Sequence, residues 1–320
     1  MGIYVFGSLN LDLVVQAPHL PRSGETLAGS NFQMLPGGKG ANQAVAAARL
    51  GGRVEMVGRV GADAFGQQLR DNLDRAGVGT KGVLTDAQTS TGLALITVAI
   101  EAAGANQIVL VPGANAQVGE PELQSLEQQL AEQPGPHWLL LQLEVPIDRV
   151  QQAAQIAKAH GATVILDPAP APPTGQTALR DLYPWVDILT PNWGEAEMLL
   201  GQSIANTTTA LAAAQALQQQ TQVATVILTL GDRGLVAVQQ APPPQTQQHW
   251  IYPALNVVAQ DTTAAGDAFN GGLAVALSEG QPWAVALDWG RAAGALATTQ
   301  VGAQGALPDR AALQHLLQRH

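Results

Sequence analysis

Asp261-Thr-Thr-Ala-Ala-Gly-Asp267-Ala-Phe-Asn-Gly-Gly272 is the segment of this chain from which the predicted fold and chemistry start. Its small residues stand directly before an apolar run with helical spacing, and Asp267 falls in the first turn. Small residues let a ligand approach the backbone, and the free N–H groups of a helix start attract anions. An anion hole beside a carboxylate suits a reaction that builds negative charge on a phosphate while a hydroxyl loses its proton. An ordinary N-cap, with Asp261 or Thr263 capping a buried helix, would give the same letters.

A second glycine-rich helix start, Pro36-Gly-Gly-Lys-Gly-Ala-Asn42, leads into an Ala-rich helix that ends at Gly51-Gly52. A Walker P-loop is excluded, because Lys39 is followed by Gly-Ala and the spacing of its glycines is wrong. What remains is a tight turn that offers N–H groups, with Lys39 and Asn42 as polar side chains at its mouth. That arrangement suits a small polyhydroxylated ligand, and a plain helix start with a solvated lysine is the alternative.

The N-terminal segment begins with a buried strand predicted over Ile3–Phe6, which Gly7-Ser8 interrupts. Asn10 and Asp12 follow, two residues apart, so in an extended segment both side chains point to the same side. An amide and a carboxylate on one face suit bidentate binding of vicinal hydroxyls. A turn in which Asn and Asp bond to nearby backbone is the alternative.

Four motifs in this order resemble the ribokinase family of sugar kinases: Gly7-Ser-Leu-Asn-Leu-Asp12, Pro36-Gly-Gly-Lys-Gly-Ala-Asn42, Pro191-Asn-Trp-Gly-Glu195 and Asp261-Thr-Thr-Ala-Ala-Gly-Asp267. The similarity runs from the first strand to about Pro308. It implies an α/β fold with a mostly parallel sheet, helices on both faces and a small β lid. It also implies an ATP-dependent sugar kinase, with D-ribose phosphorylated at O5 as the expected reaction. A kinase for another small sugar or nucleoside, and a non-catalytic sugar- or nucleotide-binding sensor, remain open.

The resemblance assigns roles to individual residues. Asp267 becomes the general base, and the backbone N–H groups before it face the transferring phosphoryl group (Ala264, Ala265, Gly266). The sugar is expected at Asn10, Asp12, Gly38, Lys39, Asn42 and Glu144, together with Asp267. The nucleotide is expected at Asn192, Glu195, Thr229, Leu230, Gly231, Asp232, Arg233, Gly234, Gly266 and Arg291.

Two cations belong to the same resemblance. Glu195 is expected to help organise Mg²⁺ and the ATP phosphates, although a first-turn glutamate is also a common helix-stabilising feature. An activating K⁺ is expected at Asp261, Thr263, Ala297, Gln300, Gly302 and Ala306. Family members commonly offer a hydroxyl at the last of these positions, whereas this chain has Ala306. We therefore expect K⁺ activation with weakened affinity.

The amino-acid composition argues against a nucleic-acid or membrane partner. Charged residues make up only 12% of the 320 residues, against roughly 25% in average globular chains. The formal net charge of -10 argues against nucleic acid, which requires a basic footprint. The chain has no cysteine, no basic segment followed by a long apolar stretch at its start, and no uninterrupted apolar run of membrane-spanning length. We expect a cytoplasmic enzyme without a membrane or nucleic-acid partner.

Two other enzyme classes fit less well. Glu144 and Asp267 could form a glycosidase pair, but such a pair would not explain two anion-accepting helix starts. A hydride-transferring Rossmann enzyme would carry G-x-G-x-x-G after the first strand, where Gly7 stands alone. The six histidines are scattered and show no zinc spacing.

Apolar strands alternate with helical patterns along the chain, which predicts parallel strands covered by helices. The resemblance implies one kinase domain over residues 1–320, with lid segments at about 13–32 and 91–110 that mediate a homodimer. The Pro-rich stretch 241–248 is predicted to form a hairpin-like surface connection. Predicted strands are Ile3–Phe6, Val54–Val57, Leu139–Leu143, Thr163–Leu166, Ile188–Thr190 and Ala224–Leu230. Predicted helices are Lys39–Leu50, Gln67–Ala76, Pro121–Glu132, Ile147–His160, Glu195–Leu200 and Thr208–Gln219.

Overall fold

The computed structural model describes residues 2–101, 105–133, 135–240 and 247–319. Within these ranges one large sheet has the strand order β13-β12-β11-β10-β9-β8-β1-β4-β5. The strands from β5 to β11 are parallel, whereas β12 and β13 are antiparallel additions at one edge. The strands are β1 (Gly2–Phe6), β4 (Val54–Gly61), β5 (Gly79–Asp86), β8 (His137–Leu141), β9 (Thr163–Leu166), β10 (Ile188–Leu189), β11 (Thr225–Thr229), β12 (Leu235–Gln240) and β13 (Gln247–Tyr252).

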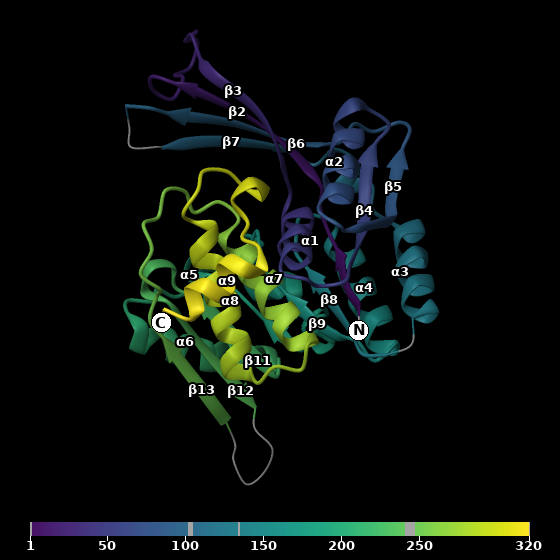
Figure 1. The fold of residues 1–320 in the computed structure, drawn as a ribbon, viewed down its shortest axis with the longest axis vertical. Coiled ribbons are helices and arrows are strands. Elements are labelled where there is room, and N and C mark those ends of the chain that lie inside the picture. Colours follow the sequence, from purple (N-terminus) through teal and green to yellow (C-terminus); the bar gives the residue numbers. More distant parts are fainter. Residues whose placement is uncertain (1, 102–104, 134, 241–246, 320) are drawn as a thin grey trace.

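Helices cover both faces of this sheet (Figure 1). The helices are α1 (Lys39–Arg49), α2 (Ala64–Arg75), α3 (Glu120–Glu132), α4 (Ile147–Ala159), α5 (Trp193–Leu200), α6 (Thr207–Thr221), α7 (Ala265–Ser278), α8 (Trp283–Ala297) and α9 (Arg310–Leu317). Short 3₁₀ turns are η1 (Gly113–Gln117), η2 (Gly175–Leu179), η3 (Tyr183–Trp185), η4 (Gly231–Arg233) and η5 (Gln304–Ala306).

Strand β1 divides two hydrophobic cores, because successive side chains of a strand point to opposite faces. Ile3 and Val5 enter the core beneath α1, α2, α7, α8 and α9. Tyr4 and Phe6 enter the core beneath α3, α4, α5 and α6. Both faces of the strand are therefore buried, as the continuous apolar run indicated.

A second, four-stranded sheet projects from one end of the molecule (Figure 1). It contains β2 (Asn10–Ala17), β3 (Ser30–Gly37), β6 (Gly92–Ala99) and β7 (Asn106–Val111) in the order β3-β2-β6-β7. The strands extend beyond the predicted segments 13–32 and 91–110, since β2 already begins at Asn10. The mostly parallel sheet, the helices on both faces and the additional small sheet are thus confirmed.

The main differences from the sequence prediction lie at the sheet edges. Strands β5, β12 and β13 were not among the predicted strands. β5 and β13 are edge strands and lack the continuous apolar run of a central strand. β12 lies between β11 and β13 and does carry such a run at residues 235–238, which the prediction overlooked. Strand β8 ends at Leu141, two residues earlier than predicted, so Gln142 follows the strand. Most of the predicted connection 241–248 lies outside the described residues.

Helix α7 is held unusually close to its neighbours, which fixes the position of its first turn. A Cβ added to Gly271 would lie 2.7 Å from the Cβ of Ala46 in α1. A Cβ added to Gly272 would lie 2.9 Å from the carbonyl oxygen of Trp289 in α8. The two glycines after Asn270 therefore serve helix packing, and they set where Asp267 lies.

Candidate active site

Most of the predicted site residues converge at the carboxyl edge of the parallel sheet. Chain order reverses between β1 and β8, which lie side by side although β4 and β5 come between them in sequence. Such a switch point opens a crevice outside the strand ends, where ligands of open α/β sheets bind. Ser8 follows β1, Glu144 follows β8, Asp167 follows β9, Asn192 follows β10 and Thr229 ends β11. The first turns of α1 and α7 face the same edge.

Asp267 is 5% exposed and lies in the first turn of α7. Asn42 Nδ2 donates to its Oδ2 at 2.9 Å, and Gln43 Nε2 donates to its Oδ1 at 3.2 Å. Burial raises the pKa of Asp267, while the charge of Lys39 and these two hydrogen bonds act to lower it. A buried carboxylate with fixed oxygens and a raised pKa has the properties of a general base.

The start of α7 has an unusual backbone. Ala264 adopts the left-handed conformation with φ of 59°, which costs a residue with a Cβ about 1–3 kcal/mol. The N–H of Ala265 donates to Thr262 at 3.3 Å, and among the described residues no side chain caps the helix. The following N–H groups, at Gly266 and Asp267, are those best placed to face an anion.

A polar cavity of about 180 Å³ lies directly in front of this helix start. Its walls combine both predicted halves of the site and consist of Lys39, Asp167, Ala169, Thr190, Asn192, Glu195, Thr229, Thr262, Ala264, Ala265, Gly266, Asp267 and Asn270. Lys39 was predicted on the sugar side, and the structure places its side chain among the phosphate-side residues. Burial alone would lower the pKa of Lys39, but the surrounding carboxylates, Asp267 and Asp167 foremost, raise it above its ordinary value. The ammonium therefore stays charged.

The sugar-side residues form a hydrogen-bonded cluster around Glu144. Its Oε2 accepts from Ser8 Oγ at 2.5 Å, from the backbone N–H of Lys39 at 3.0 Å and from Asn10 Nδ2 at 3.4 Å. Asn115 Nδ2 donates to the free oxygen of Asn10 at 2.8 Å. Gly38 begins α1 with φ of 87°, and this left-handed turn brings the Lys39 N–H to the cluster.

Asp12 lies on β2 beside this cluster, on the same side as Asn10. Gly37 packs against its carboxylate, which leaves no space for a side chain on that residue. Burial, and then the charge of Glu144, raise the pKa of Asp12 to about 7. Its carboxylate therefore changes charge near neutral pH.

Asn192 and Glu195 begin α5 with a reciprocal capping box. The Glu195 N–H donates to Asn192 Oδ1 at 2.9 Å, and the Asn192 N–H donates to Glu195 Oε2 at 2.8 Å. Glu195 therefore does stabilise the start of helix α5, the structural role that the sequence also allowed. The same carboxylate also lines the cavity, where burial raises its pKa against the lowering effect of Lys39 and Asn192. One side chain thus caps α5 and also lines the cavity.

Residues 2–310 match the family model described as pfkB family carbohydrate kinase. The chain belongs to this family. Ribokinase of Haemophilus influenzae is 40% identical over 306 residues, which are 96% of this chain and 95% of that protein. The solved ribokinase of Thermotoga maritima superposes with a TM-score of 0.83 at 34% identity, over 99% of both chains. The ribokinase of Arabidopsis thaliana complexed with ribose and ATP superposes with a TM-score of 0.85 at 32% identity, over 99% of this chain and 98% of that one.

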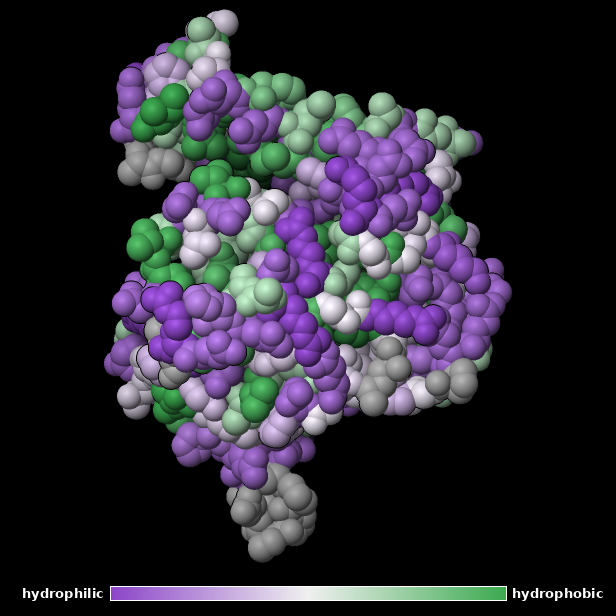
Figure 2. All heavy atoms as spheres, viewed as in Figure 1, coloured by the Kyte–Doolittle hydropathy of each residue, from purple (hydrophilic) through white to green (hydrophobic). Residues whose placement is uncertain are grey.

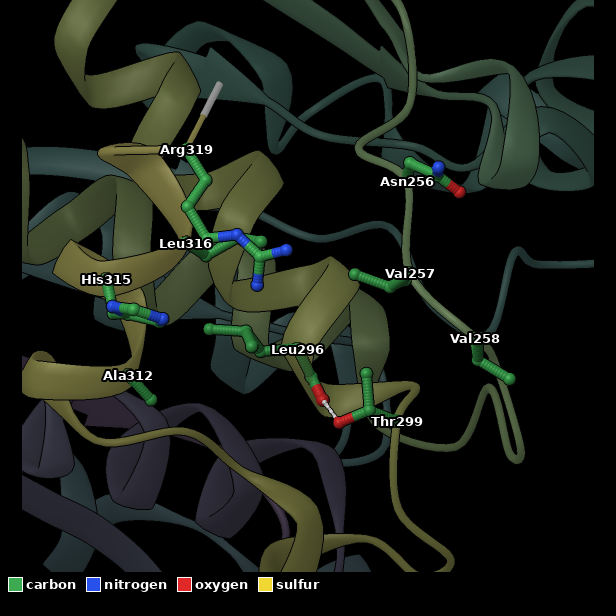
Figure 3. Close-up of a pocket in the computed structure, with 9 residues that line it drawn as sticks. All are labelled: Asn256, Val257, Val258, Leu296, Thr299, Ala312, His315, Leu316 and Arg319. Carbon is green, nitrogen blue, oxygen red and sulfur yellow. Dashed lines mark hydrogen bonds between the residues drawn. The ribbon is translucent and has the colours of Figure 1, made fainter.

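The protein is thus an ATP-dependent sugar kinase that acts on a small-molecule sugar, as the sequence motifs predicted. No helix within the described residues is long and apolar enough to cross a membrane. A second cavity of this kinase, about 320 Å³, lies between residues 256–258 and helices α8 and α9 (Figure 3). Its walls are mainly apolar, and none of the predicted site residues lines it.

Two predicted nucleotide-binding arginines of the kinase lie apart from the polar cavity. Arg233 stacks over the ring of Trp193 at 4.6 Å, and its Nη1 donates to Ala205 at 3.4 Å. Arg291 lies over the ring of Tyr252 at 5.1 Å and bonds with Pro253 and Asp288. Neither is among the residues that line the cavity. The adjacent turn follows β11 directly after Thr229 and runs from Leu230 to Gly234. Asp232 lies at its exposed tip.

Three predicted K⁺ positions meet at one carboxylate. Asp261 Oδ1 accepts from the N–H of Thr263 at 2.9 Å and from its Oγ1 at 2.6 Å, and Asp261 Oδ2 accepts from the N–H of Gly302 at 2.9 Å. Burial would raise the pKa of Asp261, but these hydrogen bonds lower it below its ordinary value. Ala297 ends α8, and Ala306 is buried at the end of η5.

Sequence reasoning missed four buried side chains at the centre of the site, Gln43, Gln142, Asp167 and Gln304. Asp167 lines the cavity, and Gln43 Nε2 donates to its Oδ2 at 2.9 Å. Burial raises the pKa of Asp167 well above its ordinary value, and Lys39 opposes this. Gln142 and Gln304 are also buried there. Asp167 could have been found by the rule used for Glu144, since it directly follows an apolar strand.

Proposed function

We propose that this kinase phosphorylates D-ribose at O5 to give ribose 5-phosphate. The observation that supports this most is the position of Asp267, which shares one cavity with a helix start, Lys39 and Glu195. The cluster at Asn10, Asp12 and Glu144 offers amide and carboxylate groups that suit a free sugar. A nucleoside would require apolar stacking surfaces, which the cluster does not provide.

In the proposed reaction Asp267 takes the proton of the sugar O5 hydroxyl as that oxygen attacks the γ-phosphorus of ATP. The bond from phosphorus to the bridging oxygen breaks, and ADP leaves. The N–H groups at the start of α7 and the ammonium of Lys39 lie where charge develops on the transferring group. The carboxylates of Asp12 and Glu144 hold the sugar hydroxyls.

Mg²⁺ fits the charge of the cavity. Asp167, Glu195 and Asp267 already surround a single ammonium, and a triphosphate would add more negative charge. Mg²⁺ is usually held by one or two carboxylates together with substrate phosphates. Glu195 and Asp167 are the residues we propose for it, and the ion would supply neutralisation of the β- and γ-phosphate oxygens.

An ATP-turnover assay with ribose, 2-deoxyribose, fructose and adenosine tests the proposal. We expect the highest kcat/KM with ribose, and a product whose phosphate is on C5 by ³¹P–¹H NMR. A higher kcat/KM for another acceptor would assign a different kinase within the family. Binding of ribose without ATP consumption would instead favour the sensor alternative.

We predict that ribose affinity rises with pH in the range where Asp12 loses its proton. An ionised carboxylate is the stronger acceptor of hydroxyl hydrogen bonds, and its pKa is about 7. Between pH 6 and pH 8 the Kd for ribose should fall by roughly five-fold, because a charge-assisted advantage of about 1.4 kcal/mol then applies to about nine tenths of the molecules instead of about one tenth. Calorimetry at the two pH values measures this effect.

The matched variant is Asp12→Asn, which keeps the shape and removes the titration. Its ribose affinity should be weak and independent of pH. Because the folded-state pKa is raised, the folded protein binds a proton that the unfolded chain releases above about pH 4, so Asp12 lowers stability increasingly from pH 4 to 7. Asp12→Asn should therefore melt higher than the parent at pH 8. A pH-dependent Kd in this variant would assign the effect to another group.

We propose K⁺ as an activator at the loop that carries Asp261. The ionised carboxylate gathers Thr263 and Gly302, and a cation there would help to shape the adjacent anion hole. Ala306 offers no side-chain oxygen, so we predict activation with weak apparent affinity, partly restored by Ala306→Ser. Initial rates against K⁺ concentration at fixed ionic strength, with Na⁺ as control, measure it. A rate indifferent to K⁺ in both parent and variant would contradict the site.

We further propose that the whole chain is one kinase domain and that the small sheet acts as a lid. We also propose that this sheet pairs with the small sheet of a second copy in a homodimer. Large apolar side chains of the small sheet are exposed, and hydrophobic residues gather there in Figure 2. They are Phe32, Met34, Leu95, Ile108, Val109, Leu110 and Val111. Monomeric proteins rarely expose such a patch. Sedimentation of Ile108→Glu, expected to be monomeric beside a dimeric parent, tests this. A cytoplasmic location also stays a prediction.

A further inference from the structure

The two oxygens of Asp267 accept hydrogen bonds from two different amide side chains, Asn42 and Gln43. An ionised carboxylate can only accept, so each amide must turn its NH₂ group toward Asp267. Its carbonyl oxygen then points away and requires a donor of its own. The orientation of each amide thus depends on the next residue outward.

Gln142 supplies that donor for Gln43. Gln142 Nε2 donates to Gln43 Oε1 at 2.6 Å, and both side chains are fully buried. The NH₂ group of Gln43 also reaches Asp167 Oδ2 at 2.9 Å, so one amide spans two carboxylates. Gly7 makes room for Gln142, because a Cβ there would collide with its Oε1. We name the chain from Gln142 through Gln43 to Asp267 the Gln142 relay.

Gln304 supplies the donor for Asn42. Gln304 Nε2 donates to Asn42 Oδ1 at 3.1 Å, and Asn72 Nδ2 donates in turn to Gln304 Oε1 at 2.5 Å. Gln304 lies in η5 and is 3% exposed, whereas Asn72 lies on α2 near the surface. We name the chain from Asn72 through Gln304 and Asn42 to Asp267 the Gln304 relay.

We propose that the Gln142 and Gln304 relays hold the catalytic carboxylate of Asp267 in one orientation, which makes Gln142 and Gln304 positioning residues for phosphoryl transfer. The proposal rests on the proposed role of Asp267 as general base. Without the outer amide, the inner one is free to rotate and to present its carbonyl oxygen to the carboxylate. That contact is repulsive, so the carboxylate would leave its position.

The electrostatic surroundings explain why such fixing matters. Lys39 of α1 attracts Asp267, whereas Glu144 after β8, Asp167 after β9 and Glu195 of α5 bear like charge around the cavity. A carboxylate among three others is pushed by each of them. The two amides neutralise part of this repulsion, and they do so only in one orientation. Buried amides cost desolvation where they are unpaired, and Gln142 Oε1 has no hydrogen-bond partner among the described residues, so apolar residues would serve packing alone more cheaply.

The first measurement compares Gln142→Met and Gln304→Met with the parent. Methionine keeps the unbranched shape and removes both hydrogen-bonding groups. We expect kcat to fall by about 10- to 100-fold, the effect of a misplaced catalytic group, with KM for ribose and ATP changed by less than about two-fold. Gln218→Met is the matched control, since Gln218 is a buried glutamine of α6 that bonds to Ala224. It should keep the parental kcat even if its melting temperature falls.

Asn72→Ala provides a variant at the surface end of the Gln304 relay, where folding is little affected. We expect kcat to fall less, by about three- to ten-fold. Gln304 keeps its hydrogen bond to Asn42 and loses only the hydrogen bond that Asn72 donates to it. If Gln304→Met fails to fold, this variant carries the test. A parental kcat in Asn72→Ala and in Gln142→Met would overturn the proposal.

The decisive measurement repeats the methionine substitutions in an Asp267→Asn background. Residues that act only through Asp267 should cause no further loss once the base is gone, so the effects should be strongly non-additive. An additional 10-fold or greater loss in that background would show a general structural role and overturn the relays. Full activity of Asp267→Asn itself would overturn both the base and the relays. An inactive Asp267→Asn beside parental methionine variants would overturn the relays alone.

Discussion

Asp267→Asn is expected to fold like the parent and to lose phosphoryl transfer by about two to four orders of magnitude, the usual contribution of a positioned general base. The asparagine keeps the shape of the side chain at the start of α7. It cannot take the proton of the attacking hydroxyl, and one of its two amide neighbours must rotate, because an amide presents only one accepting oxygen.

Single-turnover rates at saturating ribose and ATP measure this loss apart from product release. Calorimetry should show that both substrates still bind, because their contacts come mainly from other residues. Asp309→Asn is a matched control, since Asp309 caps α9 away from the cavity through a single oxygen, which accepts from the N–H of Ala312 at 2.8 Å, and asparagine caps a helix equally well. It should keep the parental rate. Turnover of Asp267→Asn within about ten-fold of the parent would contradict the assignment, because a general base contributes more than that.

The central fold could be predicted because its signals are local. Strands β1, β8, β9 and β11 are continuous apolar runs, and the helices between them show the 3.6-residue period. The edge strands β5 and β13 gave no comparable signal, since polar and apolar residues mix where only one neighbour is present. The apolar pattern also did not define the ends of the strands, since β8 ends at Leu141, two residues before the predicted end at Leu143.

Within the site, motif residues were predictable and their supporting residues were not. Asp267, Asn42 and Glu195 stand in short motifs with glycine and small residues around them. Gln142 and Gln304 are separated from Asp267 by more than thirty positions in the chain and lie in no such motif. Only the packing of α7 between α1 and α8 brings them together, and no local pattern records a tertiary contact of this kind.

The family resemblance placed Lys39 among the sugar-binding residues. In the structure the Lys39 backbone faces the sugar cluster through Glu144, while its side chain enters the cavity with Asp167, Glu195 and Asp267. The backbone N–H and the side chain of Lys39 thus leave the first turn of α1 toward different parts of the site.

Lys39→Met is therefore expected to lower kcat by about two to three orders of magnitude, comparable to removal of an oxyanion-hole donor. The ammonium is the charge that lies among the cavity carboxylates and that opposes the rise of the pKa of Asp167 and of Asp267. Without it, the transferring phosphoryl group would meet unopposed negative charge. The apparent KM for ATP should rise as well, because the same charge attracts the triphosphate in the ground state.

The same substitution should make stability depend on pH with a definite sign. Loss of Lys39 raises the folded-state pKa values of Asp167 and Asp267 further above those of the unfolded chain. The folded protein then binds more protons than the unfolded chain, and its stability falls as pH rises above the ordinary aspartate pKa of about 4. The melting temperature of Lys39→Met should thus fall further below that of the parent at pH 8 than at pH 6.

Lys158→Met is the control, because Lys158 pairs with Asp187 at 2.8 Å in a partly exposed bridge, and neither residue lines the cavity. A parental kcat in Lys39→Met, or an equal loss of melting temperature at both pH values, would show that this ammonium does not serve the carboxylates around it.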